Sequence, residues 1–436
     1  MLFSFKRYRG ASHPKPHKNR TIALAIEDGP LVEEYVFPLA MHLGAPATPI
    51  VEVGQKVQKG QKIAEAAGFI SANIHSSVSG EVIAIETRPG LNGPCDSIVI
   101  KNDYQETVYV DKEFENLPLI EKVLQAGIVG MGGATFPTNV KLRPPAHNRL
   151  DTLIVNGAEC EPYVTADTRL MIEKTNEIVE GIVILLEAFP TIKEAYIGIE
   201  DHSSEALSLM KEATKDHPKI KVRSLKAQYP QGAEKTIIKK MTGREVPSGK
   251  LPAEVGCLVQ NVATIHAIYN AVKNHQPCIS RVVTVNGNSV KNPKNLLVKY
   301  GTPMSALLNY CEADINQTKK LLAGGPMMGR TVSSLETTVI KGTNGLTLLT
   351  EEDLKPQEST PCIMCSECLN VCPVNLQPIL ISESAVRGQF DYSMTLGAMD
   401  CIECGNCTYI CPAKIPLLEN IRHAKTNLRA QKEAAK

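Results

Sequence analysis

Eight of the 13 cysteines in this 436-residue chain stand in two runs near its end, and both runs have the same spacing. The first is Cys362-x2-Cys365-x2-Cys368-x3-Cys372-Pro373, and the second is Cys401-x2-Cys404-x2-Cys407-x3-Cys411-Pro412. Spacers this short let one turning loop present several thiolates to one compact centre, and each proline prevents a regular helix or strand from continuing there. Structural zinc sites usually use two separated cysteine pairs, so a duplicated run of three plus one cysteines fits zinc badly.

The double run is similar to that of bacterial two-cluster ferredoxins. In those proteins each run gives three thiolates to one [4Fe–4S] cluster and its fourth thiolate to the other. The resemblance implies one cluster held by Cys362, Cys365, Cys368 and Cys411, and a second held by Cys401, Cys404, Cys407 and Cys372. Thiols kept for clusters are typical of a reducing cytoplasm rather than of a disulfide-bonded secreted protein.

The composition excludes several classes of protein. The length predicts roughly three domains, and a net charge of +1 gives no reason to expect a nucleic-acid partner. No apolar run approaches the ~20 residues that a helix needs to cross a bilayer. The basic N-terminus is not followed by the apolar core of a secretory signal.

Both ends of the chain are basic. Residues 1–34 are broken by prolines, and this predicts a solvated arm that can lie on a partner or on an anionic membrane surface. Residues 416–436 predict a basic helical tail without a long apolar face. The cations of the N-terminal arm are Lys6, Arg7, Arg9, Lys15, Lys18 and Arg20.

Short β-segments separated by glycines fill residues 35–117. Their pattern resembles the barrel-sandwich fold of biotinyl and lipoyl carriers. Those carriers hold a lysine at a hairpin tip, which here falls near Phe69, but no lysine stands between Lys62 and Lys101. The module is therefore predicted to be structural rather than a carrier.

Residues 118–275 alternate short apolar runs with helical stripes, which is typical of an α/β domain with a mostly parallel sheet. The expected strands are Thr152–Val155, Ala195–Ile199 and Lys221–Leu225, and the expected helices are Asp167–Glu187 and Ala233–Met241. Residues 276–350 follow as a smaller module. The polar segment 351–361 is a predicted linker to a cysteine-rich domain at 362–415.

Three polar loops with glycines lie within the α/β domain, at residues 127–141, 156–162 and 229–236. Adjacent glycines let backbone N–H groups approach a phosphate or a planar ring, and Lys141 can supply positive charge. A glycine-rich turn alone is weak evidence. The first loop also departs from the dinucleotide fingerprint G-x-G-x-x-G, because it reads Gly-Met-Gly-Gly at residues 130–133.

Together and in this order, the loops resemble the FMN- and NADH-binding flavoprotein subunit of respiratory complex I. They are more similar still to the C subunits of Rnf-type ion-translocating ferredoxin:NAD+ oxidoreductases, which share Gly-Ala-Pro at 44–46 and Gly-Gly-Pro-Met-Met-Gly at 324–329. The resemblance covers residues 35 to about 415. It implies a multidomain α/β and α+β protein with a barrel-sandwich hybrid domain, a Rossmann-like complex-I-type flavin domain, a β-grasp (SLBB-like) module and a two-cluster ferredoxin domain.

The resemblance also implies cofactors and site residues. FMN and NAD(H) are expected at the loops, with Phe136 where complex I stacks the adenine of NADH. Glu159 or Glu161 is expected to orient the nicotinamide ribose or amide, with Lys141 beside them, although either acid can instead cap a helix. The residues expected around the flavin are Gly130, Gly132, Gly133, Lys141, Asn156, Glu159, Glu161, Gly232, Glu234 and Asn261.

These expectations describe an oxidoreductase, because a flavin converts the hydride of NADH into the single electrons that clusters carry. The expected protein is a peripheral electron-transfer subunit of an Na+- or H+-translocating complex on the cytoplasmic face of the membrane. Its expected partners are the other subunits and, indirectly, ferredoxin. Two alternatives stay open: a soluble NADH-dependent cobalamin reductase with the same cofactors, and a zinc-binding adaptor without redox activity.

Overall fold

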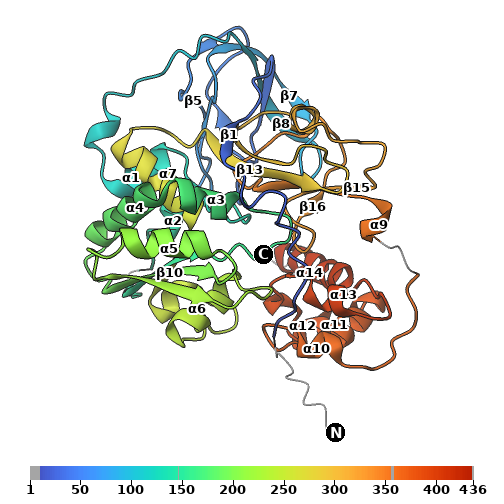
Figure 1. The fold of residues 1–436 in the computed structure, drawn as a ribbon. Helices are drawn as coiled ribbons and strands as arrows, with labels where there is room; N and C mark the ends of the chain where they lie inside the picture. Colours follow the sequence, from blue (N-terminus) through green and yellow to red (C-terminus); the bar gives the residue numbers. More distant parts are fainter. Residues whose placement is uncertain (1–9, 146, 355–357, 435–436) are drawn as a thin grey trace.

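The computed structural model describes residues 10–145, 147–354 and 358–434, which form several modules packed together (Figure 1). The first module is a sandwich of two antiparallel sheets, with strand orders β2-β8-β7-β4 and β3-β5-β6. Side chains such as Ile63, Val82 and Ile100 are fully buried between them. The strands are β2 (Glu34–Pro38), β3 (Thr48–Pro49), β4 (Lys56–Val57), β5 (Lys62–Glu65), β6 (Ile74–His75), β7 (Gly80–Arg88) and β8 (Cys95–Asn102).

The second module is built on a four-stranded parallel sheet with the order β11-β10-β9-β12. Figure 1 shows α4 and α5 on one side of this sheet and α6 on the other. The strands are β9 (Thr152–Gly157), β10 (Glu194–Glu200), β11 (Ile220–Leu225) and β12 (Cys257–Asn261). The helices are α1 (Leu119–Gln125), α2 (Thr138–Lys141), α3 (Ala166–Glu173), α4 (Thr175–Ala188), α5 (Ser204–Ala213), α6 (Glu234–Thr242) and α7 (Val262–Lys273), with short 3-10 turns at Phe114–Asn116 and Pro252–Val255.

The single helix expected over Asp167–Glu187 is wrong, because the chain forms α3 and α4 with a break at Lys174 (φ −125°, ψ 32°). The hydroxyl of Thr175 donates to the carbonyl of Met171 at 2.6 Å. A side chain that occupies this carbonyl competes with the helical ladder. The apolar stripe continues across the break, so periodicity alone does not detect it.

The third module is a six-stranded sheet with the order β1-β14-β13-β17-β15-β16. Its first strand comes from the N-terminal segment and pairs in parallel with β14. The predicted linker over 351–361 begins as a short helix, and residues 355–357 lie outside the described part of the chain. The elements are β1 (Ile26–Asp28), β13 (Ser280–Gly287), β14 (Lys294–Lys299), α8 (Met304–Tyr310), β15 (Lys320–Ala323), β16 (Arg330–Thr331), β17 (Gly345–Leu349) and α9 (Glu351–Leu354).

The N-terminal segment does not form the solvated arm that its composition predicts. From residue 10 it runs between the other modules before it reaches β1, as the dark blue trace in Figure 1 shows. The ammonium of Lys18 is buried and donates to the carbonyl of Glu159. The guanidinium of Arg20 donates to the carbonyl of Gly287 at 2.7 Å. The prediction is wrong for these residues because carbonyls far along the chain bind the cations, while Lys6, Arg7 and Arg9 lie outside the described residues.

The last module contains the two cysteine runs and consists of short helices. The expected C-terminal tail is part of it, because α14 has a long apolar face that is buried in the core of this module. The prediction that this helix lacks such a face is therefore wrong. The buried side chains of α14 are Leu417, Leu418, Ile421, Ala424 and Leu428. The helices are α10 (Glu367–Asn370), α11 (Pro378–Val386), α12 (Phe390–Thr395), α13 (Asn406–Ile410) and α14 (Leu417–Ala434), with a 3-10 turn at Ala398–Asp400.

Within residues 10–145, 147–354 and 358–434, no helix combines the length and the apolar character that crossing a membrane requires.

The packing of α14 predicts that Ile421→Ala destabilises the cysteine-rich module. Ile421 is 1% exposed, and removing a buried side chain of this size lowers the free energy of unfolding by about 2–5 kcal/mol. Hydrogen exchange of the α11 and α14 amides measures this local loss. The control is Arg429→Ala on the exposed side of the same helix, for which we expect a change below about 0.5 kcal/mol. Equal exchange in the two variants would contradict the assignment of α14 to the core.

Candidate functional site

The strand order of the parallel sheet locates a candidate site. The chain proceeds from β9 to β10 and β11 on one side, and then returns to place β12 on the other side of β9. Ligands of open parallel sheets bind outside the carboxyl ends of the strands at such a reversal. Asn156 and Asn261 lie opposite each other in register at these ends of β9 and β12. The predicted site residues can be located relative to this point.

The loop at residues 130–137 lies beside this reversal. The N–H of Gly130 donates to the carbonyl of Phe136 at 2.8 Å and closes the loop, while Phe136 itself is half-buried. A Cβ on Gly132 would lie 3.5 Å from the Asn261 side chain. Among the described residues, the N–H groups of Gly132, Gly133 and Ala134 have no hydrogen-bond partner. Unpaired N–H groups at a strand end fit the phosphate or the ring oxygens of a flavin nucleotide.

Residues of all three of the first modules hold the same loop from outside. The N–H of Met131 donates to the Thr264 hydroxyl at 2.9 Å, and its carbonyl accepts from the guanidinium of Arg281 at 3.1 Å. From the barrel-sandwich module, the N–H of Leu43 donates to the carbonyl of Thr135 at 3.1 Å. Residues outside the loop therefore fix its conformation.

Lys141 and Glu234 form an ion pair next to this loop. The ammonium donates to the Glu234 carboxylate at 2.5 Å and to the carbonyl of Val259 at 3.2 Å. Both side chains are partly exposed, at 28% and 39%. The pair therefore leaves a cation accessible at the strand ends.

Asn156 and Gly232 bring the third loop onto the second. The Asn156 amide donates to the carbonyl of Gly232 at 2.8 Å and accepts from the N–H of Ala158 at 3.1 Å. A Cβ on Gly232 would lie 2.4 Å from the carbonyl oxygen of Ala158, a distance that real side chains do not reach. Glycine is thus required here for the close approach of the two backbones.

Glu159 is buried at the start of α3. Its carboxylate accepts from the N–H of Asp167 at 2.8 Å and from the hydroxyl of Thr168 at 2.8 Å, so it caps the first turn of α3. The Lys18 ammonium lies 3.9 Å from the same carboxylate. These contacts match the role of a helix cap.

Glu161 points to a different part of the chain. Its two carboxylate oxygens accept from the N–H groups of Met327 at 3.2 Å and Met328 at 2.8 Å, in the turn at 324–329. Burial raises the pKa of Glu161 to about 7, against the opposite effect of these hydrogen bonds. The Glu161 carboxyl also contacts the Tyr229 side chain, so it joins the turn at 324–329 to the third loop, and its role toward a nucleotide stays a prediction.

Asp167 is a site-forming residue that the sequence did not single out. Its carboxylate accepts from the Asn261 amide at 2.6 Å, and the Asn261 side chain also caps α7 through the N–H of Ala263. Burial, followed by the nearby Glu159 carboxylate, raises the pKa of Asp167 to about 7. The sequence does contain one indication of this role, because Asp167 ends the polar stretch that begins at Asn156 and lies at the start of an expected helix.

The cysteine thiols form two groups. The Cys368 thiol interacts electrostatically with the thiols of Cys365, Cys411 and Cys362. We call these four residues set A. Among the described residues, no group of three or more His, Cys, Asp or Glu side chains is placed to hold a single metal ion.

The second group contains the other four cysteines of the two runs. The Cys407 thiol interacts with those of Cys401, Cys404 and Cys372, and we call these four residues set B. The fourth cysteine of each run thus lies with the first three of the other run. Backbone N–H groups donate to the sulfurs in both sets, for example from Met364 to Cys362 at 3.4 Å and from Glu403 to Cys401 at 3.4 Å. Such bonds suit thiolates that hold an iron–sulfur cluster.

Tyr229 joins the glycine loops to set B. Its hydroxyl donates to the carbonyl of Cys404 at 2.8 Å, and its backbone pairs with Ser12 of the N-terminal segment. The Asn406 amide donates to the carbonyl of Tyr229 at 3.1 Å and accepts from the Ser12 hydroxyl at 2.6 Å. All three residues are buried. The segment that holds set B therefore contacts the parallel-sheet module.

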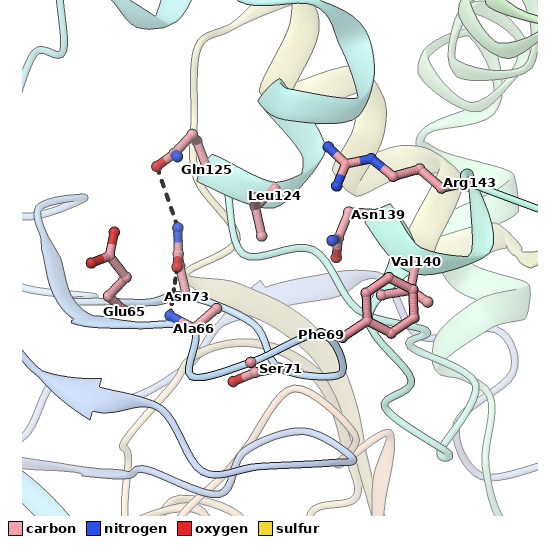
Figure 2. Close-up of a pocket in the computed structure, with 11 residues that line it drawn as sticks. Glu65, Ala66, Phe69, Ser71, Asn73, Leu124, Gln125, Asn139, Val140 and Arg143 are labelled. Atoms are coloured by element: carbon pink, nitrogen blue, oxygen red, sulfur yellow. Dashed lines mark hydrogen bonds between the residues drawn. The ribbon is translucent and has the colours of Figure 1, made fainter.

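The turn between β5 and β6 is also held against the parallel-sheet module. Phe69 on this turn lines a cleft of about 310 Å³ together with Asn139 and Arg143. Figure 2 labels these side chains. Asn73 on the same turn donates to Gln125 of α1 at 3.3 Å. This turn corresponds to the hairpin tip of carrier domains, and here it is tied down.

The contacts of Glu159 predict a structural effect of its removal. Glu159→Ala leaves the first turn of α3 uncapped and removes the carboxylate beside the buried Lys18 ammonium, so we expect the free energy of unfolding to fall by about 3 kcal/mol. Denaturant unfolding measures this loss. Glu234→Ala is the control, because a partly exposed ion pair contributes less than about 1 kcal/mol. A smaller effect for Glu159→Ala than for Glu234→Ala would contradict the capping role.

Four family models match successive parts of the chain. They are the RnfC barrel sandwich hybrid domain at residues 6–105, the Nuo51 FMN-binding domain at 123–270, the SLBB domain at 282–331 and the 4Fe-4S dicluster domain at 361–415. These matches confirm the predicted fold class, and they support FMN and iron–sulfur clusters as the cofactors. The boundaries between the modules stay predictions.

A solved structure shares the fold. A chain of the NAD+-reducing [NiFe]-hydrogenase in the H2-reduced state superposes with a TM-score of 0.52 at 16% identity. The match covers 74% of this chain and 63% of that one. At this identity the likeness shows the fold alone.

Curated relatives match nearly the whole chain. The C subunit of the proton-translocating ferredoxin:NAD(+) oxidoreductase complex of Clostridium ljungdahlii is 42% identical over 99% of this chain and 96% of its own length. The C subunit of the Na(+)-translocating complex of Acetobacterium woodii is 41% identical over 98% of both chains. The C subunit of an ion-translocating oxidoreductase complex of Rhodobacter capsulatus is 41% identical over 96% of this chain and 83% of its own. The chain therefore belongs to the family of C subunits of ion-translocating ferredoxin:NAD+ oxidoreductase complexes.

Proposed function

We propose that this chain is the peripheral subunit that exchanges electrons with NAD(H) in a membrane-bound ferredoxin:NAD+ oxidoreductase that translocates Na+ or H+. The observation that carries the proposal is the direct contact, through Tyr229, between the loops at the sheet reversal and the set B cysteines. Flavin bound at the loops would exchange a hydride with NAD(H) and single electrons with the clusters. Near-full-length relatives that are parts of such complexes favour this function over a soluble cobalamin reductase, and the dicluster match favours it over a zinc-binding adaptor.

The roles of the protein groups follow from their positions. The free N–H groups of Gly132 and Gly133 would bind flavin oxygens, and the Lys141 ammonium would balance negative charge on the phosphate or on the reduced ring. Glu234 orients that ammonium. Asn156 and Asn261 would hold the loops around the flavin in place, through bonds to Gly232 and Asp167. Phe136 is the proposed stacking partner of the adenine of NAD(H).

The two thiol sets are the proposed ligands of two [4Fe–4S] clusters, with each run giving its fourth cysteine to the other cluster. Electrons would pass between the flavin and the cluster of set B, and then between the two clusters. Partners in the membrane would exchange electrons with this chain and carry the ion path. The chain would sit on the cytoplasmic side, where NAD(H) is available.

Lys141 offers the sharpest test of the flavin site. Lys141→Met removes a charged hydrogen-bond donor, so we expect the rate of flavin reduction by NADH to fall ten- to hundredfold. Anaerobic stopped-flow absorbance measures this rate, and iron content checks that both clusters remain. Lys211→Met, an exposed site on α5, is the matched control and keeps the rate of the unmodified chain. An unchanged rate in Lys141→Met would contradict the proposed site.

A further inference from the structure

The two cysteine runs have nearly the same sequence but different surroundings. Met364 in the first run and Glu403 in the second occupy matching places, and both have a left-handed backbone (φ 55° and 56°). Met364 is 87% exposed. Glu403 is covered by α14, so the C-terminal helix lies against set B and not against the matching place in the first run.

Two cations of α14 face Glu403. The ammonium of Lys425 donates to the Glu403 carboxylate at 2.5 Å and to the carbonyl of Cys401 at 2.8 Å. The guanidinium of Arg422 donates to the other oxygen of the same carboxylate at 3.0 Å. Two positive charges against one negative charge leave a net charge of +1 beside Cys401. The Lys425 side chain is 7% exposed, so water screens its charge weakly.

This cation lies against the backbone of a proposed cluster ligand, because the Lys425 ammonium donates to the carbonyl of Cys401. Among the described residues, no lysine or arginine side chain donates a hydrogen bond to a cysteine of set A, whereas Lys425 donates to Cys401 of set B. The positive charge is therefore a property of set B.

Set B also needs a compensating charge more than set A does. Cys372, Cys404 and Cys407 are buried, whereas Cys365 of set A is exposed. An electron added to a buried cluster is not stabilised by water, and its charge is costly unless the protein compensates it. A fixed ammonium nearby supplies that compensation.

We propose that Lys425 raises the reduction potential of the set B cluster. With this charge nearby, the cluster accepts an electron at a higher potential than its burial alone would allow. The inference rests on the proposed clusters at sets A and B. In the step concerned the cluster gains one electron, no bond forms or breaks and no proton moves. Lys425 stays an ammonium and acts through its charge as a positioning residue, because reduction potentials of clusters follow the charge and hydrogen bonds around them. The C-terminal helix thus tunes the electron path.

The test is an EPR-monitored redox titration of the full cluster-loaded chain. Lys425→Met is expected to lower the midpoint potential of one cluster and to leave the other unchanged. The expected change in the electron occupancy of that cluster is about tenfold, which is 59 mV for a one-electron couple. Lys425→Arg keeps the charge and should restore the potential. Lys432→Met, on the exposed side of the same helix, should change neither cluster.

Cys365→Ser assigns the EPR signals to the two clusters, because it removes a ligand of set A. The signal whose potential shifts in Lys425→Met should remain unaltered in Cys365→Ser. If Lys425→Met does not retain its clusters, Glu403→Gln decides the question. It removes the negative charge while Lys425 remains, so the potential of the same cluster must rise. The inference would be overturned if the potentials stayed unchanged in whichever of Lys425→Met and Glu403→Gln retains its clusters. It would also be overturned if Lys432→Met shifted a potential as much as Lys425→Met does. An unmodified chain without two clusters would instead refute the proposed function.

Discussion

Two buried cations shape the loop on which the rest of the site depends. The ammonium of Lys341 is fully buried and donates to the carbonyls of Gly127 and Asn73, each at 2.6 Å. The guanidinium of Arg281, also buried, donates to the carbonyl of Met131. In the part of the chain that the structure describes, no carboxylate pairs with either cation, so backbone carbonyls satisfy both, and burial lowers the pKa of Lys341 to about 8. Removing these carbonyl acceptors would leave buried charges unpaired, which is strongly unfavourable. The third module thereby fixes the glycine loop of the second against the first.

Buried hydrogen bonds also connect the glycine loops to the cysteine-rich module. Ser12, Tyr229 and Asn406 come from three distant parts of the sequence and satisfy one another's polar groups in a buried interface. Polar groups buried in this way hold one geometry, because any displacement leaves some of them unpaired. Electron transfer between a flavin and a cluster needs such a fixed separation. The N-terminal segment, which from its sequence could be a free arm, is a structural part of this interface.

The sequence predicts best what local patterns determine. Buried parallel strands are continuous apolar runs between glycine loops, so β9 and β10 were predicted to within about two residues. The resemblance to two-cluster ferredoxins likewise implied two sets of four cysteines, and the thiols lie near one another in these sets, while their binding of clusters stays a prediction. The roles of Lys18 and Lys425 were not predictable, because each depends on a partner set by tertiary packing; Lys18 is 141 residues away from Glu159. For the same reason the resemblance implied roles near the flavin for the glutamates at 159 and 161, but it could not predict that Glu159 caps α3 or that Glu161 accepts from the turn at 324–329.

We propose that one chain converts hydride into single electrons through a fixed contact between the flavin site and the cluster of set B, which passes electrons to the second cluster. Anaerobic titration of the isolated, cofactor-loaded chain with NADH, followed by optical and EPR spectra, tests it most directly. We predict that NADH reduces the flavin and that cluster signals then develop, so that the chain stores more electrons than the two a flavin alone can hold. Flavin that is reduced while both clusters stay oxidised, although a strong chemical reductant reduces them, would contradict the account.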